Sequence, residues 1–282
     1  MIHIIADTTS SIPVAQAEEL GIAYLPQIII FGNQSYRDDN EIDTATFLKR
    51  LRTSTTLPQT AAPPPVLYNP IYQKLGTKGN TLIVLCPSTD LSGTYRSATV
   101  AAADFPDADI RIIDTRTIAS GLGSIVLQAL QWAKEGQDAD TLVANIQEMS
   151  RRSRSYFLVD TLEYLYKGGR IGGAKMLFGS LLQVKPILML KDGHTEPAET
   201  QRTKRRALTR IKELVAENFP RHHPAHLTIS HGDAEEEAHK LAEDLKTELG
   251  LSEVPVYEMP PAIIVHAGPG VLAVSFFMDT PA

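Results

Sequence analysis

The stretch that decides the fold runs from residue 81 to residue 94 and reads Thr-Leu-Ile-Val-Leu-Cys-Pro-Ser-Thr-Asp-Leu-Ser-Gly-Thr. Its first part, residues 81–86, is a short continuous apolar run, which is typical of a strand buried inside a parallel sheet. A polar loop that contains Ser92 and Gly93 follows, and residues 94–104 are expected to form a helix. A buried strand that leads through a short loop into a helix predicts an α/β fold.

The same alternation extends through the first half of the chain. Further strands are expected at residues 2–6, 22–31 and 110–114, and further helices at residues 13–20, 44–53, 66–75, 118–135 and 139–149. Residues 55–65 are expected to be a Pro-rich loop, because proline fixes φ and cannot join a central strand. The first half is therefore predicted to hold a parallel sheet that helices cover on both faces.

The second half follows a different pattern. Asp192-Gly193 separates two strand-like segments, residues 185–191 and 194–199, and predicts a β-hairpin because Asp-Gly suits the positive φ of a tight turn. The other expected elements are strands at residues 156–159, 227–230, 254–258 and 271–278 and helices at residues 162–166, 203–219 and 233–249. We therefore expect two α/β domains, residues 1–160 and residues 161–282.

Composition narrows the function classes. Of the 282 residues, 43% are hydrophobic, which excludes a disordered chain, and 27 basic against 33 acidic residues give a net charge of −6. That charge argues against a general nucleic-acid binder. Cys86 is the single cysteine and suits a reducing compartment. Neither a signal peptide nor a run of the roughly 20 apolar residues that a membrane helix needs is evident, so we expect a cytoplasmic protein without stable membrane insertion.

The loop at Ser92-Gly93-Thr94 offers a place for an anion. It follows an apolar strand and opens a helix, where exposed N–H groups and the helix dipole favour negative charge. Ser92 and Thr94 add hydroxyl donors. The alternative is that Ser92 only caps the helix, which is a common role for serine.

Two glycine-containing segments in the second half carry basic side chains. Residues 167–173 lack the Gly-Lys-Ser/Thr ending of a Walker A loop, but Arg170 between two glycine pairs could bind a carboxylate or a phosphate. The alternative is a flexible turn with a solvated arginine. In His266-Ala267-Gly268-Pro269-Gly270, His266 could donate to an anion and titrate near neutral pH. The alternative there is a structural turn histidine.

Signatures of catalysis are missing. The sequence has no Gly-x-Ser-x-Gly nucleophile elbow, no His-Glu-x-x-His and no Cys-x-x-Cys. Asp7 and Asp114 each end a predicted strand and could hold Mg²⁺, although a solvated or N-capping role is favoured. We expect no catalytic residue, no metal and no cofactor, since hydroxyls, one arginine, one histidine and backbone amides suit binding of an oxyanion.

The order and spacing of these motifs resemble the DegV family of bacterial fatty-acid-binding proteins along essentially the whole chain. The resemblance is carried by residues 6–10 (Ala-Asp-Thr-Thr-Ser), 35–39 (Ser-Tyr-Arg-Asp-Asp), 91–98 (Leu-Ser-Gly-Thr-Tyr-Arg-Ser-Ala), 162–171 (Leu-Glu-Tyr-Leu-Tyr-Lys-Gly-Gly-Arg-Ile), 185–188 (Lys-Pro-Ile-Leu) and 266–270 (His-Ala-Gly-Pro-Gly).

The resemblance implies a fold and a ligand. It implies an N-terminal parallel-sheet α/β domain, a C-terminal α/β domain with a mixed sheet, and one long-chain fatty acid bound between them. It further implies that the protein presents the carboxylate to a separate ATP-dependent fatty-acid kinase, which makes acyl-phosphate for phospholipid synthesis.

The resemblance also implies the ligand-binding residues. The family's carboxylate contacts, a Thr in a Thr-Ser-Gln-Pro loop and the Ser of Leu-Ser-Gly-Thr, map to Thr60 and Ser92. The remaining residues expected at the polar end are Gly93, Thr94, Arg170, His266 and Gly268. Ala61-Ala62 replaces the family's Ser-Gln and removes two hydrogen-bonding groups, which bears on head-group affinity or on coupling to the kinase.

Other interpretations stay open at this stage. The chain could be a phosphotransferase-type enzyme, or it could bind another small amphipathic anion. The run Arg202, Lys204, Arg205 and Arg206 could dock an acidic kinase partner or could simply be a solvated helix face. For the lipid tail, residues 28–30, the helix after Gly121 and residues 176–182 are candidates, and each is equally consistent with ordinary core.

Overall fold

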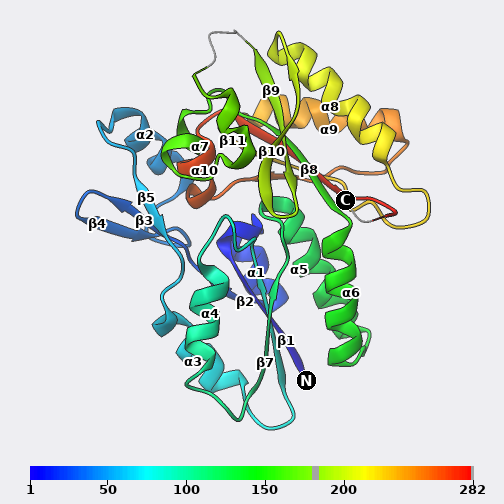
Figure 1. Cartoon of the computed structure of the whole chain (residues 1–282). Helices are drawn as coiled ribbons and strands as arrows, with labels where there is room; N and C mark the ends of the chain where they lie inside the picture. The colour runs from blue at the N-terminus through cyan, green and yellow to red at the C-terminus, as the bar shows by residue number, and fades with distance from the viewer. Residues whose placement is uncertain (180–183, 281–282) are drawn as a thin grey trace. The chain divides into compact units, whose positions relative to one another are not determined.

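The computed structural model describes residues 1–179 and 184–280 and separates into two compact units (Figure 1). Unit 1 comprises Met1–Ser150 with Pro260–Ala262, and unit 2 comprises Arg151–Met259 with Ile263–Ala282. The units therefore divide between Ser150 and Arg151, whereas the sequence analysis places the boundary at residue 160. The difference arises because strand β8 (Ser153–Leu158) pairs with strands of unit 2 on both sides.

Unit 1 is built on a parallel sheet, as predicted. Its four strands lie in the order β2-β1-β6-β7, and every neighbouring pair is parallel. The strands are β1 (Ile2–Asp7), β2 (Ala23–Leu25), β6 (Thr81–Cys86) and β7 (Asp109–Asp114). Residues of β6 from Leu82 onward are fully buried, which matches the expectation for a central strand.

Helices cover both faces of this sheet (Figure 1). On one face α3 and α4 contribute Tyr68, Tyr72 and Ala98 to a core with Ile5 and Val84 of the strands. On the other face α5 packs against β1 and β6. The helices of unit 1 are α1 (Val14–Leu20), α2 (Thr44–Thr53), α3 (Pro65–Leu75), α4 (Thr94–Ala102), α5 (Ala119–Lys134) and α6 (Ala139–Arg151).

A second, smaller sheet in unit 1 corrects two predictions. Residues 22–31 are not one strand, because Pro26 and Gln27 separate β2 from β3 (Ile28–Phe31). The predicted loop at residues 55–65 contains strand β5 (Gln59–Ala61), which lies between Pro58 and the three prolines at residues 63–65. Strand β3 pairs antiparallel with β5 and with β4 (Gln34–Arg37).

Unit 2 contains a six-stranded mixed sheet, as the resemblance implies. The order is β10-β9-β8-β13-β11-β12, and all neighbours are antiparallel except β11 and β12. The remaining strands are β9 (Lys185–Lys191), β10 (His194–Gln201), β11 (Thr228–Gly232), β12 (Val256–Glu258) and β13 (Val271–Phe277). The predicted β9–β10 hairpin is confirmed, with φ of 49° at Asp192 and 80° at Gly193.

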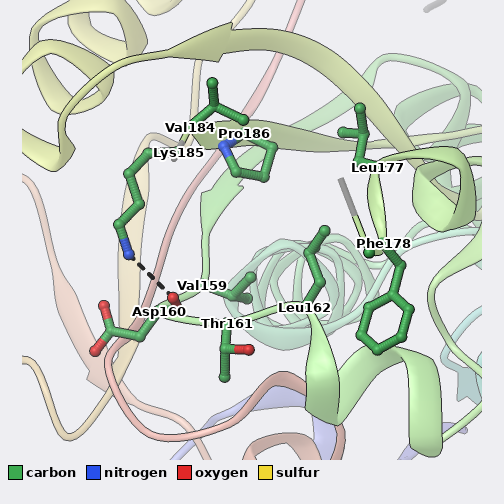
Figure 2. A pocket seen from close by; sticks show the side chains of 10 residues that line it. Val159, Asp160, Thr161, Leu162, Leu177, Phe178, Val184, Lys185 and Pro186 are labelled. Carbon is green, nitrogen blue, oxygen red and sulfur yellow. Dashed lines mark hydrogen bonds between the residues drawn. The ribbon is translucent and has the colours of Figure 1, made fainter. Parts of the chain in front are cut away.

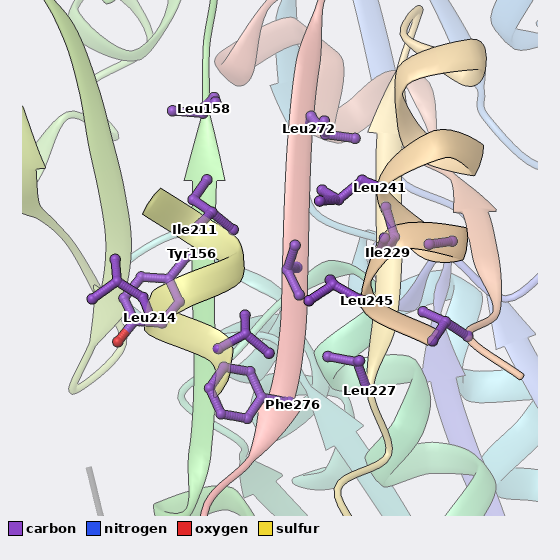
Figure 3. Close-up of a cluster of buried hydrophobic side chains, with 14 of the residues drawn as sticks. Tyr156, Leu158, Ile211, Leu214, Leu227, Ile229, Leu241, Leu245, Leu272 and Phe276 are labelled. Atoms are coloured by element: carbon purple, nitrogen blue, oxygen red, sulfur yellow. The ribbon is translucent and has the colours of Figure 1, made fainter. Parts of the chain in front are cut away.

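The core of unit 2 lies between this sheet and two long amphipathic helices (Figure 3). Helices α8 (Lys204–Asn218) and α9 (Glu235–Leu249) direct Ile211 and Leu241 onto Ile229, Leu272 and neighbouring strand residues. Shorter elements are α7 (Glu163–Lys167), the 3₁₀ helix η2 (Gly172–Leu177) and α10 (Pro261–Ala267). Helix α10 was not predicted, and it places His266 near a helix end rather than in a loop.

Candidate functional site

In the parallel sheet of unit 1, the order in which the chain adds strands reverses next to β1. The chain leaves β1 through α1 to β2 on one side, and later enters β6 on the other side of β1. In open α/β sheets, ligands bind at the carboxyl ends of the strands where the strand order reverses. Here that point lies between the end of β1, at Asp7, and the end of β6, at Cys86.

The predicted hydroxyl pair lies in the loop that follows β6. Ser92 Oγ and Thr94 Oγ1 are 3.0 Å apart, and the Thr94 amide donates to Ser92 Oγ at 3.3 Å. Thr94 is buried, whereas Ser92 is only half-buried. Ser92 thus accepts from the first N–H of α4, although the N-cap residue of this helix is Gly93.

The segment that follows β5, the strand that carries Thr60, runs beside the start of α4. Thr60 lies on β5 opposite Ile29, and a Cβ at Gly93 would meet the Ala62 side chain at 3.6 Å. The Ser97 hydroxyl of α4 donates to the carbonyl of Pro63. The structure therefore brings Ala62 and Pro63 next to Gly93 and Ser97, and Ala62 contributes a methyl group here in place of a hydrogen-bonding side chain.

Two buried carboxyl groups support this end of the sheet, and the sequence analysis missed the second of them. Asp7 accepts from the Thr9 amide at 2.8 Å and from the Thr9 hydroxyl. Asp7 therefore caps a 3₁₀ turn, which is the N-capping role that the sequence favours. Asp38 accepts from the Thr8 hydroxyl at 2.8 Å and from the Gln27 amide at 2.8 Å. Burial raises the pKa of Asp7 and raises the pKa of Asp38 to about 7, with the charge of Asp7 adding to the second rise.

Gln27 connects these carboxyl groups to the hydroxyl pair. It is 3% exposed, and its side-chain nitrogen donates to Asp7 Oδ2 and to Thr94 Oγ1, both at 3.0 Å. The sequence gives only one signal for this residue, an amide directly after Pro26 inside an otherwise apolar segment.

Unit 2 holds a separate basic cluster at Gly168. Arg170 Nη1 donates to the Gly168 carbonyl at 2.6 Å, and a Cβ at Gly168 would lie 2.3 Å from His266 Nδ1. The structure therefore brings Arg170 and His266 together, and it requires glycine between them. Gly268 is also required, because its φ is +81° and a Cβ would lie 2.5 Å from the Tyr164 ring.

The electrostatics of this cluster differ from the expectation for His266. Burial lowers the pKa of His266 to about 4, and the charge of Arg170 lowers it further. Burial also lowers the pKa of Arg170. His266 is therefore a neutral imidazole at neutral pH rather than a group that titrates there, although it can still form hydrogen bonds.

Unit 2 also contains a pocket of about 220 Å³, whose lining includes Leu162 directly before helix α7 (Figure 2). Its lining combines the apolar side chains of Val159, Leu162, Leu177 and Phe178 with polar groups of Asp160, Thr161 and Lys185. The Lys185 ammonium donates to the carbonyl of Asp160 at 3.0 Å. Of the predicted tail residues 176–182, residues 180–182 lie outside the described part of the chain.

The other predicted tail segments lie in unit 1, where Ile28 and Ile30 are half-buried. Ile29 and the α5 residues Leu122 and Ile125 have no exposed surface. By contrast, Met176 is 79% exposed, and Phe178 stacks on the Tyr166 ring with centroids 4.0 Å apart.

The predicted docking residues lie at the start of α8. Lys204 pairs with Glu237 at 2.6 Å and with Asp160 at 3.6 Å. Arg202 and Arg205 are exposed. The Lys204 ammonium is thus engaged in ion pairs within unit 2, whereas the side chains of Arg202 and Arg205 face solvent.

Within residues 1–179 and 184–280, no three His, Cys, Asp or Glu side chains gather as a metal site would require. Over the same ranges, every helix is too short or too polar to cross a membrane.

The fold defines a two-unit α/β protein in which the hydroxyls of Ser92 and Thr94 lie at the switch point of a parallel sheet. The family model described as "Uncharacterised protein, DegV family" matches residues 1–279. The chain belongs to the DegV family.

Curated relatives match over nearly their whole length. A DegV domain-containing protein of Streptomyces coelicolor is 34% identical over 275 residues, covering 97% of each chain. Protein DegV of Bacillus subtilis is 31% identical over 274 residues, covering 97% of this chain and 98% of the relative.

Solved structures share the fold. A fatty-acid-binding DegV family protein from Thermus thermophilus has a TM-score of 0.88 and 29% identity, covering 98% of this chain and 99% of its own. DegV of Bacillus subtilis, described as a fatty acid binding protein, has a TM-score of 0.85 and 29% identity, with 99% coverage of both chains. A fatty-acid-binding DegV family protein of Streptococcus agalactiae has a TM-score of 0.89 and 25% identity, again with 99% coverage of both chains.

Proposed function

We propose that this protein binds a single long-chain fatty acid and that Thr60 and Ser92 hold the carboxylate. The observation that carries the proposal is the half-buried hydroxyl of Ser92, which accepts from the Thr94 amide at the switch point of the sheet. The fatty-acid binding of the DegV proteins from Thermus thermophilus and Bacillus subtilis supports the choice of ligand.

The remaining ligand-binding residues are proposed in two groups. In unit 1, Gly93 allows close approach of the backbone, and Thr94 supports Ser92. In unit 2, Arg170 and His266 offer N–H donors beside one another, and Gly268 lets the chain pass Tyr164. Each group suits an oxyanion, because amides, hydroxyls and a guanidinium all donate to negative oxygen atoms.

The tail and the carboxylate of a fatty acid would contribute differently to the binding free energy. Each buried methylene contributes about 0.8 kcal/mol, so a tail of roughly 14 carbons gives on the order of 11 kcal/mol before association costs. Hydrogen bonds to a charged acceptor contribute about 1.5–3 kcal/mol each. The tail therefore supplies most of the affinity, and the hydroxyls orient the carboxylate.

We further propose that the protein has no catalysis of its own and presents the carboxylate to a separate fatty-acid kinase. Exposed Arg202 and Arg205 at the start of α8 are the proposed docking residues, together with Lys204. An acidic surface on the kinase would complement them. Acyl-phosphate formed in this way would serve phospholipid synthesis.

Calorimetric titration of the delipidated protein with palmitate tests the binding proposal. We expect one site per chain and no binding of short anions such as acetate. Binding of a small amphipathic anion other than a fatty acid, with no heat from palmitate, would overturn the proposal. Incubation of the isolated protein with palmitate, ATP and Mg²⁺ tests the enzyme alternative. Acyl-phosphate formed without an added kinase would show a phosphotransferase.

A further inference from the structure

Asp38 joins the small sheet of unit 1, strands β4, β3 and β5, to the parallel sheet. Its carboxyl group accepts from the Thr8 hydroxyl, in the turn after β1, at 2.8 and 3.0 Å. It also accepts from the backbone amide of Gln27 at 2.8 Å, and the Asp38 amide donates to the Gln27 carbonyl at 3.1 Å. Gln27 leads directly into β3, the central strand of the small sheet. One side chain therefore holds the point at which the small sheet meets β1.

The small sheet also carries Thr60, one of the two residues proposed to hold the carboxylate. Thr60 on β5 lies opposite Ile29 on β3. Gln27 comes directly before β3 and Asp38 directly after β4, so both stand at the same end of this antiparallel sheet. The position of Thr60 relative to β1 therefore depends in part on the contacts of Asp38.

Two buried carboxyl groups meet at this point. Asp38 is 8% exposed and Asp7 is 1% exposed. Gln27 binds both of them, with its backbone amide on Asp38 and its side-chain nitrogen 3.0 Å from Asp7 Oδ2. Two negative charges buried side by side are costly unless a cation compensates them, so such a pair favours holding a proton.

The ionisable groups nearest to the pair are acidic. In the part of the chain that the structure describes, neither Asp7 nor Asp38 forms an ion pair, and Arg37 pairs with the carboxylate of Asp39. Tyr24 on β2 adds a buried phenol close to both carboxyl groups. Burial raises the pKa of Asp38 to about 7, and the charges of Asp7 and Asp39 add to the rise. The small sheet in its docked position therefore favours the protonated form of Asp38.

We propose that Asp38 is a positioning residue for Thr60, and that loss of its proton releases the small sheet from β1, so that a bound fatty acid leaves faster as the pH rises. This inference rests on the proposed carboxylate contact of Thr60 and deepens it by adding a form of regulation. The sign follows from linkage. A state in which water reaches Asp38 holds fewer protons than the docked state, so its population grows as the pH rises.

The test measures the rate at which palmitate leaves the loaded protein, by transfer to an excess of serum albumin, at about pH 6 and about pH 8. The wild type is expected to release palmitate about tenfold faster at the higher pH, because the undocked population grows up to tenfold for each pH unit above the midpoint of proton loss. Asp38→Asn keeps an oxygen that accepts hydrogen bonds but carries no charge, so its two rates are expected to agree within about twofold.

Asp43→Asn is the matched control, because it makes the same substitution elsewhere in unit 1. Asp43 caps α2 by accepting from the Thr46 amide at 2.7 Å, and asparagine caps helices equally well. This variant is expected to keep the tenfold difference. Any effect of the ionisation of palmitate itself is common to all the proteins compared.

Thr60→Val tests whether Asp38 acts through Thr60. This variant lacks the hydroxyl that the small sheet is proposed to position, so it is expected to release palmitate faster at about pH 6 and to show little further change at about pH 8. A Thr60→Val variant that keeps the full pH dependence would overturn the positioning role.

A second measurement covers the case in which Asp38→Asn does not fold. In wild-type protein labelled with ¹³C at the aspartate carboxyl groups, the Asp38 signal is expected to titrate near pH 7. Titration near the ordinary value of 3.8 would overturn the inference.

The outcomes separate this inference from the proposed function. A wild type that takes up no palmitate contradicts the proposed function. A wild type that binds palmitate but releases it equally fast at both pH values, or an Asp38→Asn variant that keeps the tenfold difference, would overturn the role of Asp38 and leave fatty-acid binding standing.

Discussion

The Thr8 hydroxyl donates to both carboxylate oxygens of Asp38, at 2.8 and 3.0 Å. The two residues are 30 positions apart, and the contact ties the turn after β1 to the turn after β4. The Gln27 amide also donates to Asp38 at 2.8 Å, so the same carboxyl group holds the segment between the two sheets of unit 1. Asp38 therefore holds together three segments of unit 1, at Thr8, at Gln27 and at the end of β4.

The protonation of Asp38 is expected to affect stability. Burial raises its pKa to about 7 from the ordinary value of 3.8, so the folded state binds a proton that the unfolded state releases. Between these two pKa values the folded state holds more protons than the unfolded state. The free energy of unfolding is therefore expected to increase as the pH falls through about 7 and to decrease as the pH rises again. Urea unfolding at about pH 5 and about pH 8 measures this change. The Asp38→Asn variant should show a smaller difference in the free energy of unfolding between the two pH values. An unchanged difference would contradict the account.

Ser92→Ala is expected to weaken palmitate binding by about tenfold to a hundredfold, because one hydrogen bond to a charged acceptor is lost while the tail contacts remain. Calorimetric titration of the delipidated variant measures the loss. Thr99→Ala is the control, since the Thr99 hydroxyl donates only to the Tyr95 carbonyl on the same helix. A Ser92→Ala protein that retains no lipid at all would show that the head group supplies most of the affinity.

Gly168→Ala is expected to destabilise the protein by about 1–3 kcal/mol, a typical cost of inserting a methyl group into a packed site. The new Cβ would lie 2.3 Å from His266 Nδ1 and 2.9 Å from the Tyr164 carbonyl. Gly93→Ala is the control for stability, because its Cβ would meet Ala62 at an ordinary 3.6 Å and its φ is −80°. Equal denaturation midpoints for the two variants would argue against close packing of His266 on Gly168.

Charge reversal at the start of α8 is expected to separate lipid binding from presentation. Arg202→Glu with Arg205→Glu should retain bound oleate but lower acyl-phosphate formation by an added fatty-acid kinase about tenfold, since like charges would then face an acidic partner. The effect should weaken at high salt. Lys78→Glu, an exposed reversal in unit 1, should change nothing. Undiminished transfer by the α8 variant would exclude these arginines from docking.

The regular parts of the fold were predictable because they depend on local patterns. The apolar run at residues 81–86 and the Asp192-Gly193 turn specify β6 and the β9–β10 hairpin without reference to distant residues. Strand β4 was missed because its sequence, Gln-Ser-Tyr-Arg, lacks the apolar alternation of a half-buried strand. Helix α10 was missed because the glycines at 268 and 270 suggest a loop.

The candidate site was predictable only in part, for a physical reason. Ser92 and Thr94 follow a strand and open a helix, so their local position indicates an anion site. Gln27 reaches Thr94 across 67 residues, and Asp38 reaches Thr8 across 30. Their roles arise from the pairing of β1 with β2 and β6 and from a second sheet that the sequence did not reveal.

Mass spectrometry of an organic extract of the purified, denatured protein tests the central claim most directly. The account predicts a near-stoichiometric long-chain fatty acid, and the spectrum would give its chain length and saturation. An empty extract from a protein that also takes up neither palmitate nor oleate would contradict the proposed ligand, and the head site would then have to serve a different anion.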